Sequence, residues 1–173
     1  MTNTKQPSGG ARASGKPHVC PVWIGYLLAS PVRRWFENPE RILAPLARPG
    51  QLALDVGCAM GFFTLPLARL VGPQGRVVAV DVQQKMLDGL ARRLRKRGLA
   101  DRVESRLSDA HGLPLDDLAA SVDIALIVHV VHEVPDPGAL FSQIATAMKP
   151  GGWVIGVKRK VGPAAADGRS AVG

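Results

Sequence analysis

The chain has 173 residues, of which 46% are apolar and only two are cysteines, and its formal net charge at pH 7 is +8. This length and composition suit one domain with a sizeable core, and they exclude a disulfide-stapled secreted scaffold. The longest apolar run, around residues 124–131, contains His129 and is shorter than the roughly 20 residues that a membrane-spanning helix needs. Because the first residues also lack the apolar segment of a secretory signal, we expect a soluble protein of the cytoplasm.

The positive charge is concentrated at the two ends of the chain. Residues 1–36 contain five basic and no acidic residues, and residues 158–173 contain four basic and one acidic, so the residues between them are neutral overall. Basic tails can assist association with polyanions, so a nucleic-acid partner stays open but is not favoured. One internal basic cluster, Arg92 to Arg97, is expected at the end of a helix, where cations complement the helix dipole and form a solvated face.

The N-terminal part of the chain divides into two predicted segments. Residues 1–16 are rich in Gly, Ser and Lys and are expected to be a disordered basic tail. Residues 17–48 are expected to form a helical cap that carries Trp23, Tyr26, Trp35 and Phe36. Aromatic side chains can hold a cation by cation–π attraction, but packing of this cap against the sheet is the favoured explanation.

Residues 49–158 predict an α/β domain, because apolar strands alternate with helical patterns. Such alternation is typical of a Rossmann-like, doubly wound parallel sheet in a three-layer sandwich. Apolar residues at helical spacing predict two helices that cover the sheet. The first pattern comprises Met86, Leu87, Leu90, Ala91 and Leu94, and the second comprises Leu140, Phe141, Ile144 and Met148.

The most informative segment runs from Leu52 to Phe63, where an apolar strand ends in a carboxylate and turns on small residues into a helix. A dinucleotide fingerprint would place its third glycine at Phe62, and a P-loop would need a lysine and a hydroxyl after Gly61. The negative charge of Asp55 would repel a phosphate but suits an ammonium or a sulfonium. The turn is therefore predicted to bind a ligand without phosphate.

The segment from Asp55 to Gly61 resembles the first motif of the class I S-adenosylmethionine-dependent methyltransferases, an acidic residue followed by Gly-x-Gly-x-Gly. Further matches follow in the family's order across residues 40–158. The resemblance implies S-adenosylmethionine as cofactor, with Asp55, Gly57, Ala59 and Gly61 around its methionine end. Ala59 departs from the family's middle glycine, and its methyl group would weaken binding if this residue needs a positive φ.

The later matches imply contacts with the rest of the cofactor. Asp81 ends a second predicted strand, Arg76 to Asp81, and resembles the family's ribose-binding acid. Asp109 and Ala110 follow a third strand and resemble the loop that contacts adenine. Each carboxylate also has a plain structural alternative: Asp55 and Asp81 could cap the helices that follow, and Asp109 could belong to an ordinary turn.

Methyl transfer is an in-line displacement, so the enzyme has mainly to align the reacting groups. Where the acceptor must lose a proton, His132, just beyond the predicted fourth strand at residues 122–128, is the candidate catalytic base, although the family often carries a histidine there for structural reasons. No metal site is predicted, because His18 and Cys20 with His111 or His132 do not form a recognisable zinc spacing.

The resemblance implies methyl transfer, and the neutral centre of the chain favours a small-molecule acceptor over RNA. The family's domain usually continues past the fifth strand with a helix and a hairpin, whereas residues 159–173 lack strand alternation and are expected to be a disordered tail. The predicted domain thus looks truncated after the fifth strand, whose exposed edge is a candidate site for homodimerisation. A non-catalytic or degenerate S-adenosylmethionine-binding protein is therefore the alternative to an active enzyme, and an RNA methyltransferase is a further one.

Overall fold

The computed structural model describes residues 38–109, 112–128 and 136–157. Five parallel strands form one sheet in the order β3-β2-β1-β4-β5. Their bounds are Leu52–Val56 for β1, Arg76–Asp81 for β2, Val103–Leu107 for β3, Val122–Val128 for β4 and Met148–Val157 for β5. The predicted Rossmann-like parallel sheet is confirmed. The strand order reverses between β1 and β4, which is the point at which open α/β sheets bind ligands.

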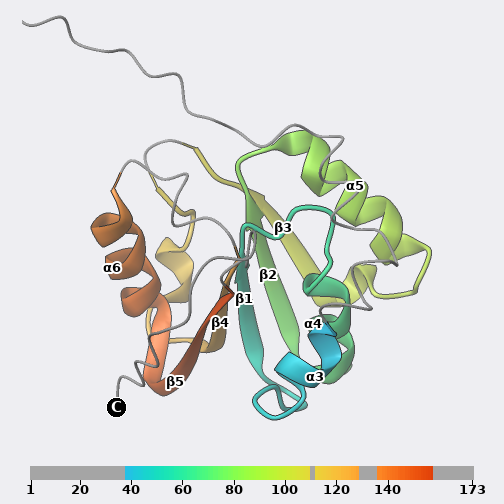
Figure 1. Ribbon diagram of the computed structural model, residues 1–173, viewed down its shortest axis with the longest axis horizontal. Coiled ribbons are helices and arrows are strands. Elements are labelled where there is room, and N and C mark those ends of the chain that lie inside the picture. The colour runs from blue at the N-terminus through green and yellow to red at the C-terminus, as the bar shows by residue number, and fades with distance from the viewer. Residues whose placement is uncertain (1–37, 110–111, 129–135, 158–173) are drawn as a thin grey trace, which may run out of the picture.

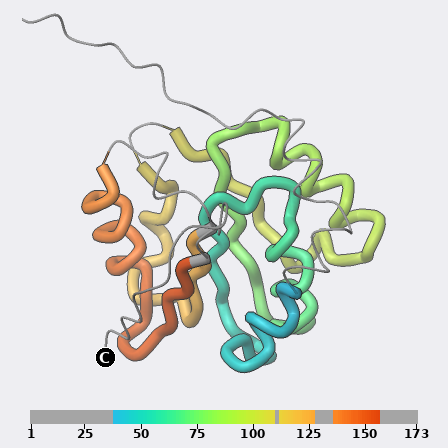
Figure 2. Tube along the Cα trace, in the orientation of Figure 1, coloured from blue at the N-terminus to red at the C-terminus, as the bar shows by residue number. Residues whose placement is uncertain are grey.

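Helices cover both faces of this sheet (Figure 1). One face carries α3 (Pro39–Leu43), α4 (Thr64–Leu70) and α5 (Gln84–Arg95), and the other carries α6 (Pro137–Ala147) with the short helix η2 (Asp116–Leu118). A second short helix, η1 (Ala100–Arg102), joins α5 to β3. The three-layer arrangement places the carboxyl ends of β1 and β2 at the same edge of the sheet, where the loops to α4 and α5 begin (Figures 1 and 2).

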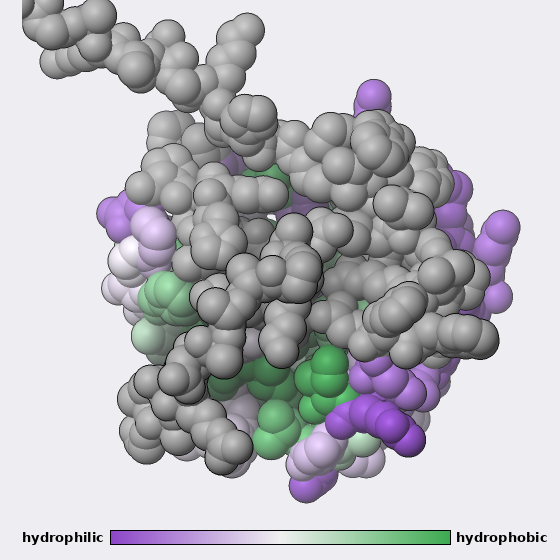
Figure 3. Space-filling model, in the orientation of Figure 1, coloured by the Kyte–Doolittle hydropathy of each residue, from purple (hydrophilic) through white to green (hydrophobic). Residues whose placement is uncertain are grey.

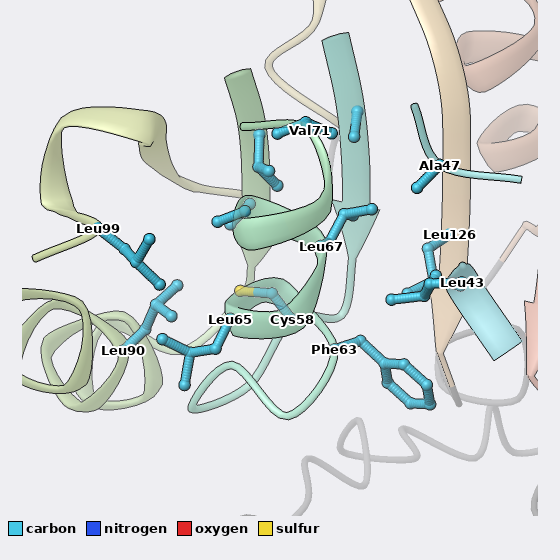
Figure 4. Packing of buried hydrophobic residues seen from close by; sticks show 14 of the residues in the cluster. Leu43, Ala47, Cys58, Phe63, Leu65, Leu67, Val71, Leu90, Leu99 and Leu126 are labelled. Carbon is cyan, nitrogen blue, oxygen red and sulfur yellow. The ribbon is translucent and has the colours of Figure 1, made fainter. Parts of the chain in front are cut away.

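The core lies on both faces of the sheet because the central strands are apolar on both sides, as is usual for parallel strands. On one face, Ala53, Ala79 and Leu126 contact the leucines of α4 and α5. Figure 4 shows Leu65, Leu90 and Leu99 gathered between these two helices. On the other face, a second cluster joins the sheet to α6 and η2. Its leucine and isoleucine members are Leu54, Leu115, Leu118, Ile127, Leu140 and Ile144.

The two predicted helical faces have different outcomes. In α5, Met86, Leu87, Leu90 and Leu94 are buried as predicted. In α6 the buried face consists of Leu140, Ile144 and Ala147 instead, while Phe141 is 45% exposed and Met148 begins β5. Residues spaced by four and three positions share one face of a helix, and Phe141 is rotated about 100° from Leu140. The prediction of Phe141 and Met148 as part of that face was therefore wrong.

Strand β5 lies at the edge of the sheet, and among the described residues it pairs with β4 alone. The pairing is irregular at its start, since Val122 pairs with Met148 but Ile124 pairs with Trp153. Trp153 and Val154 on this strand are 58% and 50% exposed. An exposed edge is what the prediction of a homodimer requires, and the dimer itself stays a prediction.

In the ranges that the structure covers, no helix combines the length and the apolar character needed to cross a membrane. The expected basic tail at residues 1–16, most of the expected cap at residues 17–48 and the expected tail at residues 159–173 lie outside the described residues. Of the cap, the structure describes α3 and the turn after it, and the buried side chain of Leu43 joins the core beneath α4.

Candidate functional site

The loop after β1 is a tight turn that needs left-handed backbone at three alternate residues. The φ angles are +77° at Gly57, +46° at Ala59 and +83° at Gly61. The N–H groups of Gly57 and Cys58 both donate to the carbonyl oxygen of Val80, at 2.9 and 3.1 Å, so the turn is fastened to the end of β2. We call residues 57–61 the glycine turn. Its position at the reversal of strand order makes it the centre of the candidate site.

Ala59 has a positive φ, at which its methyl group strains the backbone. Its φ of +46° lies in the region that favours glycine, where an L residue is strained by roughly 1 kcal/mol. An alanine with left-handed backbone thus stands at the position that corresponds to the middle glycine of the family's motif. This strain destabilises the folded state whether or not a ligand is bound.

Helix α5 packs directly against the back of the glycine turn. A Cβ atom at Gly61 would lie 2.4 Å from Cδ1 of Leu90, and one at Gly89 would lie 2.9 Å from Cγ of Met60. Nη1 of Arg93 donates to the carbonyl oxygen of Met60 at 2.6 Å. Helix α5 therefore supports the turn through close packing at Gly61 and Gly89 and through the hydrogen bond from Arg93.

Arg93 is a site-supporting residue that the sequence reasoning missed, because the whole basic cluster was expected to be a solvated face. Arg92, Arg95, Lys96 and Arg97 are exposed as expected, whereas Arg93 is half-buried. The available signal was its spacing, since Arg93 follows Gly89 by four residues and therefore shares the helix face that meets the turn.

Asp81 at the end of β2 is buried and connects two loops. Its Oδ2 accepts a hydrogen bond from the N–H of Ala59 and its Oδ1 accepts one from the N–H of Gln83, both at 2.9 Å. The N-cap residue of α5 is Gln83, so Asp81 is not the cap of that helix. Burial raises the pKa of Asp81, while the backbone N–H groups act in the opposite direction. Each carboxylate oxygen can accept a further hydrogen bond, so Asp81 can still receive hydroxyl groups from a ligand.

Asp55 is fully buried one residue before the end of β1. Its Oδ2 accepts a hydrogen bond from Oγ1 of Thr64 at 2.6 Å, and its Oδ1 has no hydrogen-bond partner in the described part of the chain. It does not cap α4, whose N-cap residue is Phe63. Burial raises the pKa of Asp55 to about 7, the bond from Thr64 lowers it, and the charge of Asp81 raises it further. An orphaned buried carboxyl oxygen is costly and marks a place for a proton or a ligand group.

This raised pKa gives the unligated protein a stability that depends on pH. Between about pH 4 and pH 7 the unfolded chain ionises Asp55 while the folded chain keeps the proton, so this residue's contribution to the free energy of unfolding falls as pH rises. Asp55→Asn removes the titration, because an amide stays neutral. We expect the stability of the variant relative to the wild type to rise by roughly 2 kcal/mol from pH 5 to pH 7. Urea unfolding at both pH values measures this change, and parallel profiles would contradict it.

Asp109 lies in the loop after β3 and is exposed. Its Oδ1 accepts a hydrogen bond from the N–H of Gly112 at 3.3 Å, and the two residues form an antiparallel bridge. Ser108 ties this loop to the site, because its N–H donates to the carbonyl oxygen of Asp81 at 2.9 Å. The plain turn role of Asp109 is therefore present, and its contact with adenine stays a prediction. Ala110 and His132, the other predicted site residues, lie outside the described residues.

The structure thus brings Asp55, Asp81 and Asp109 to the same edge of the sheet, at or just after the carboxyl ends of β1, β2 and β3. The glycine turn between them contains no lysine or hydroxyl side chain. In such a site Asp81 can accept hydrogen bonds from the hydroxyl groups of a ligand. The carboxylates can also stabilise a positive charge on the ligand. Among the described residues no group of three or more His, Cys, Asp or Glu side chains is placed to hold a metal ion.

Comparison with known proteins agrees with this geometry. Residues 54–156 match the sequence profile of a family described as a methyltransferase domain. A demethylmenaquinone methyltransferase of Lactobacillus johnsonii is 36% identical over 107 residues, which are 62% of this chain and 43% of that protein. A 37.1 kDa protein encoded in a transposon of Streptomyces fradiae is 38% identical over 109 residues, which are 63% of this chain and 30% of that protein. The chain thus spans less than half the length of these two relatives.

Solved structures show the same fold. A SAM-dependent methyltransferase from Aquifex aeolicus superposes with a TM-score of 0.74 at 27% identity, covering 84% of this chain and 79% of its own. The [4+2]-cyclase SpnF superposes with a TM-score of 0.59 at 28% identity, covering 68% of this chain and 43% of its own. The second likeness shows that this fold also serves a protein named for a different reaction.

Proposed function

The chain belongs to the methyltransferase-domain family, as its resemblance to the class I S-adenosylmethionine-dependent methyltransferases predicted, and from that premise we propose that it binds S-adenosylmethionine and transfers the methyl group to a small molecule. The observation that carries the proposal is the pair of hydrogen bonds from Ala59 and Gln83 to Asp81. These bonds fix one carboxylate between the glycine turn and the start of α5. A cofactor with a ribose needs an acceptor at that place.

The residues present suit the cofactor at three points. The left-handed backbone of the glycine turn lets a ligand approach the main chain closely. Asp81 can accept the ribose hydroxyl groups through its remaining lone pairs. The unpartnered Oδ1 of Asp55 and the charge of Asp81 favour a ligand with positive charge at its methionine end. We assign Gly57, Ala59 and Gly61 to the same end, and Asp109 with Ala110 to adenine.

When bound, S-adenosylmethionine supplies a methyl group activated by a positively charged sulfur. The chain's own contribution is to orient that group and to keep water from it. The buried packing of α4 and α5 behind the glycine turn supports its backbone, which suits positioning. We propose His132 as the group that takes a proton from the acceptor where one must be lost.

A small-molecule acceptor is supported by the name of the Lactobacillus johnsonii relative, which acts on demethylmenaquinone. We therefore propose an aromatic ring compound of that kind as the first acceptor to test. The non-catalytic alternative has an observation of its own, the strained alanine at position 59. The likeness to a cyclase of the same fold also shows that family membership does not by itself fix the reaction.

The decisive experiment incubates the purified chain with S-adenosylmethionine labelled in its methyl group, together with reduced demethylmenaquinone analogues and, separately, with RNA. We expect label in the extracted quinol and none in RNA, and we expect His132→Gln to lower kcat while leaving the Kd of S-adenosylmethionine unchanged. Binding of the cofactor without transfer to any acceptor tested would favour the non-catalytic alternative. Label in RNA alone, with RNA affinity that falls steeply with salt, would replace the small-molecule proposal.

A further inference from the structure

A hollow lies between α4 and α5 on the side of the glycine turn that faces these helices. It is a shallow depression that is open to solvent. Phe62, Leu65 and Pro66 form an apolar lining, and Arg69, Arg93 and Arg97 supply three guanidinium groups. We propose that this arginine hollow binds the phosphate group of a small anion. Gly61 of the glycine turn also lines the hollow, whereas Asp55, Asp81 and Asp109 do not.

The charge of the arginine hollow is strongly positive because none of its lining residues is acidic. Arg69 bonds to Glu40 at 3.4 Å, but both side chains are more than 40% exposed, and such pairs contribute only about 0–1 kcal/mol. The guanidinium of Arg97 has no hydrogen bond or ion pair with another described residue. The carboxyl end of α5 opposes an anion with about half a negative charge, which three full positive charges outweigh.

The chemistry of the lining favours phosphate over other anions. A guanidinium presents two parallel N–H groups that match two oxygens of a phosphate, and several arginines can share one tetrahedral group. Arg93 donates to the carbonyl oxygen of Met60, so the proposal relies on Arg69 and Arg97 for the direct contacts with phosphate.

A confined site and a diffuse basic surface depend on different sets of arginines. Arg92, Arg95 and Lys96 are exposed near the same end of α5 but do not line the hollow. Figure 3 shows hydrophilic side chains along the edge of the molecule where Figure 1 places α5. An extended polyanion would be attracted by all these charges, whereas a single phosphate group in the hollow depends on Arg69 and Arg97.

The test is calorimetric titration of the full chain with inorganic phosphate and with a nucleoside monophosphate at constant ionic strength. Arg97→Gln removes one charge from the hollow, and Arg95→Gln removes one charge two residues away as the matched control. Arg93 is left intact because it also holds the glycine turn. We expect Arg97→Gln and Arg69→Gln each to weaken phosphate binding at least tenfold, and Arg95→Gln to change it less than twofold.

The two ligands separate the possible sources of the phosphate. Binding of both with similar affinity supports a site for phosphate itself, and tighter binding of the monophosphate supports a site for a phosphate ester. Equal weakening by Arg95→Gln and Arg97→Gln would overturn the proposal in favour of a diffuse basic face. The proposal would also fail if the folded wild-type chain bound neither ligand.

Discussion

Asp81→Ala should weaken the binding of S-adenosylmethionine at least 100-fold while the chain still folds. The wild-type carboxylate holds the N–H groups of Ala59 and Gln83 and, in the proposed complex, the two hydroxyl groups of the ribose. Hydrogen bonds to a charged group contribute about 1.5–3 kcal/mol each, so losing two ligand bonds removes roughly 3–6 kcal/mol. That free energy corresponds to a factor of at least a hundred in Kd.

Calorimetric titration of both proteins measures this ratio, and urea unfolding confirms that the variant is folded. The matched control is Asp101→Ala, which removes a carboxylate from an exposed position on η1. Its Kd should stay within twofold of the wild type. Unchanged cofactor binding in Asp81→Ala, with both proteins folded, would show that Asp81 only organises the loops.

Gly61→Ala should lower the free energy of unfolding by about 2–5 kcal/mol. The new methyl group meets two obstacles. The φ angle of +83° strains any L residue, at a cost of roughly 1–2 kcal/mol. The Cβ atom would also lie 2.4 Å from Cδ1 of Leu90, which is fully buried in the core and has little room to move. Overpacking of this kind typically costs about 1–3 kcal/mol.

Replacing alanine by glycine in the same turn provides the comparison for Gly61→Ala. Ala59→Gly relieves a positive φ, so it should cost nothing or stabilise the fold by up to about 1 kcal/mol. Urea unfolding of the wild type and both variants under one set of conditions decides the matter. If Gly61→Ala were as stable as the wild type, α5 would not pack against the turn as described.

The spacing of apolar residues along the sequence was enough to predict most of the fold. The strands and α5 follow from apolar runs and helical spacing, and both kinds of pattern arise within a few consecutive residues. Phe141 was misplaced because the second helical pattern has two adjacent apolar residues, 140 and 141, and only contact with the sheet decides which one is buried. Met148 continued the helical spacing, but the helix ends at Ala147 and β5 begins there.

Site residues that belong to a recognisable motif could be predicted from the sequence. Contacts between segments that are distant in the sequence could not. Asp55, Gly57 and Asp81 were identified from their places at the ends of predicted strands and from the resemblance to the family's motifs. The bonds from Ala59 to Asp81 and from Arg93 to Met60 join residues 22 and 33 positions apart, so no local pattern contains them. The hydroxyl of Thr64, which bonds to Asp55, was missed for the same reason, because its partner lies on the preceding strand.

The most direct test of the central proposal is titration of the purified wild-type chain with S-adenosylmethionine at neutral pH. The proposed site predicts binding of one molecule per chain with a Kd in the micromolar range, equivalent to about 8 kcal/mol. Cooperative unfolding in urea must accompany the titration, so that a negative result comes from folded protein. A chain that unfolds cooperatively and takes up no S-adenosylmethionine would contradict the assignment of the glycine turn and Asp81 as its binding site.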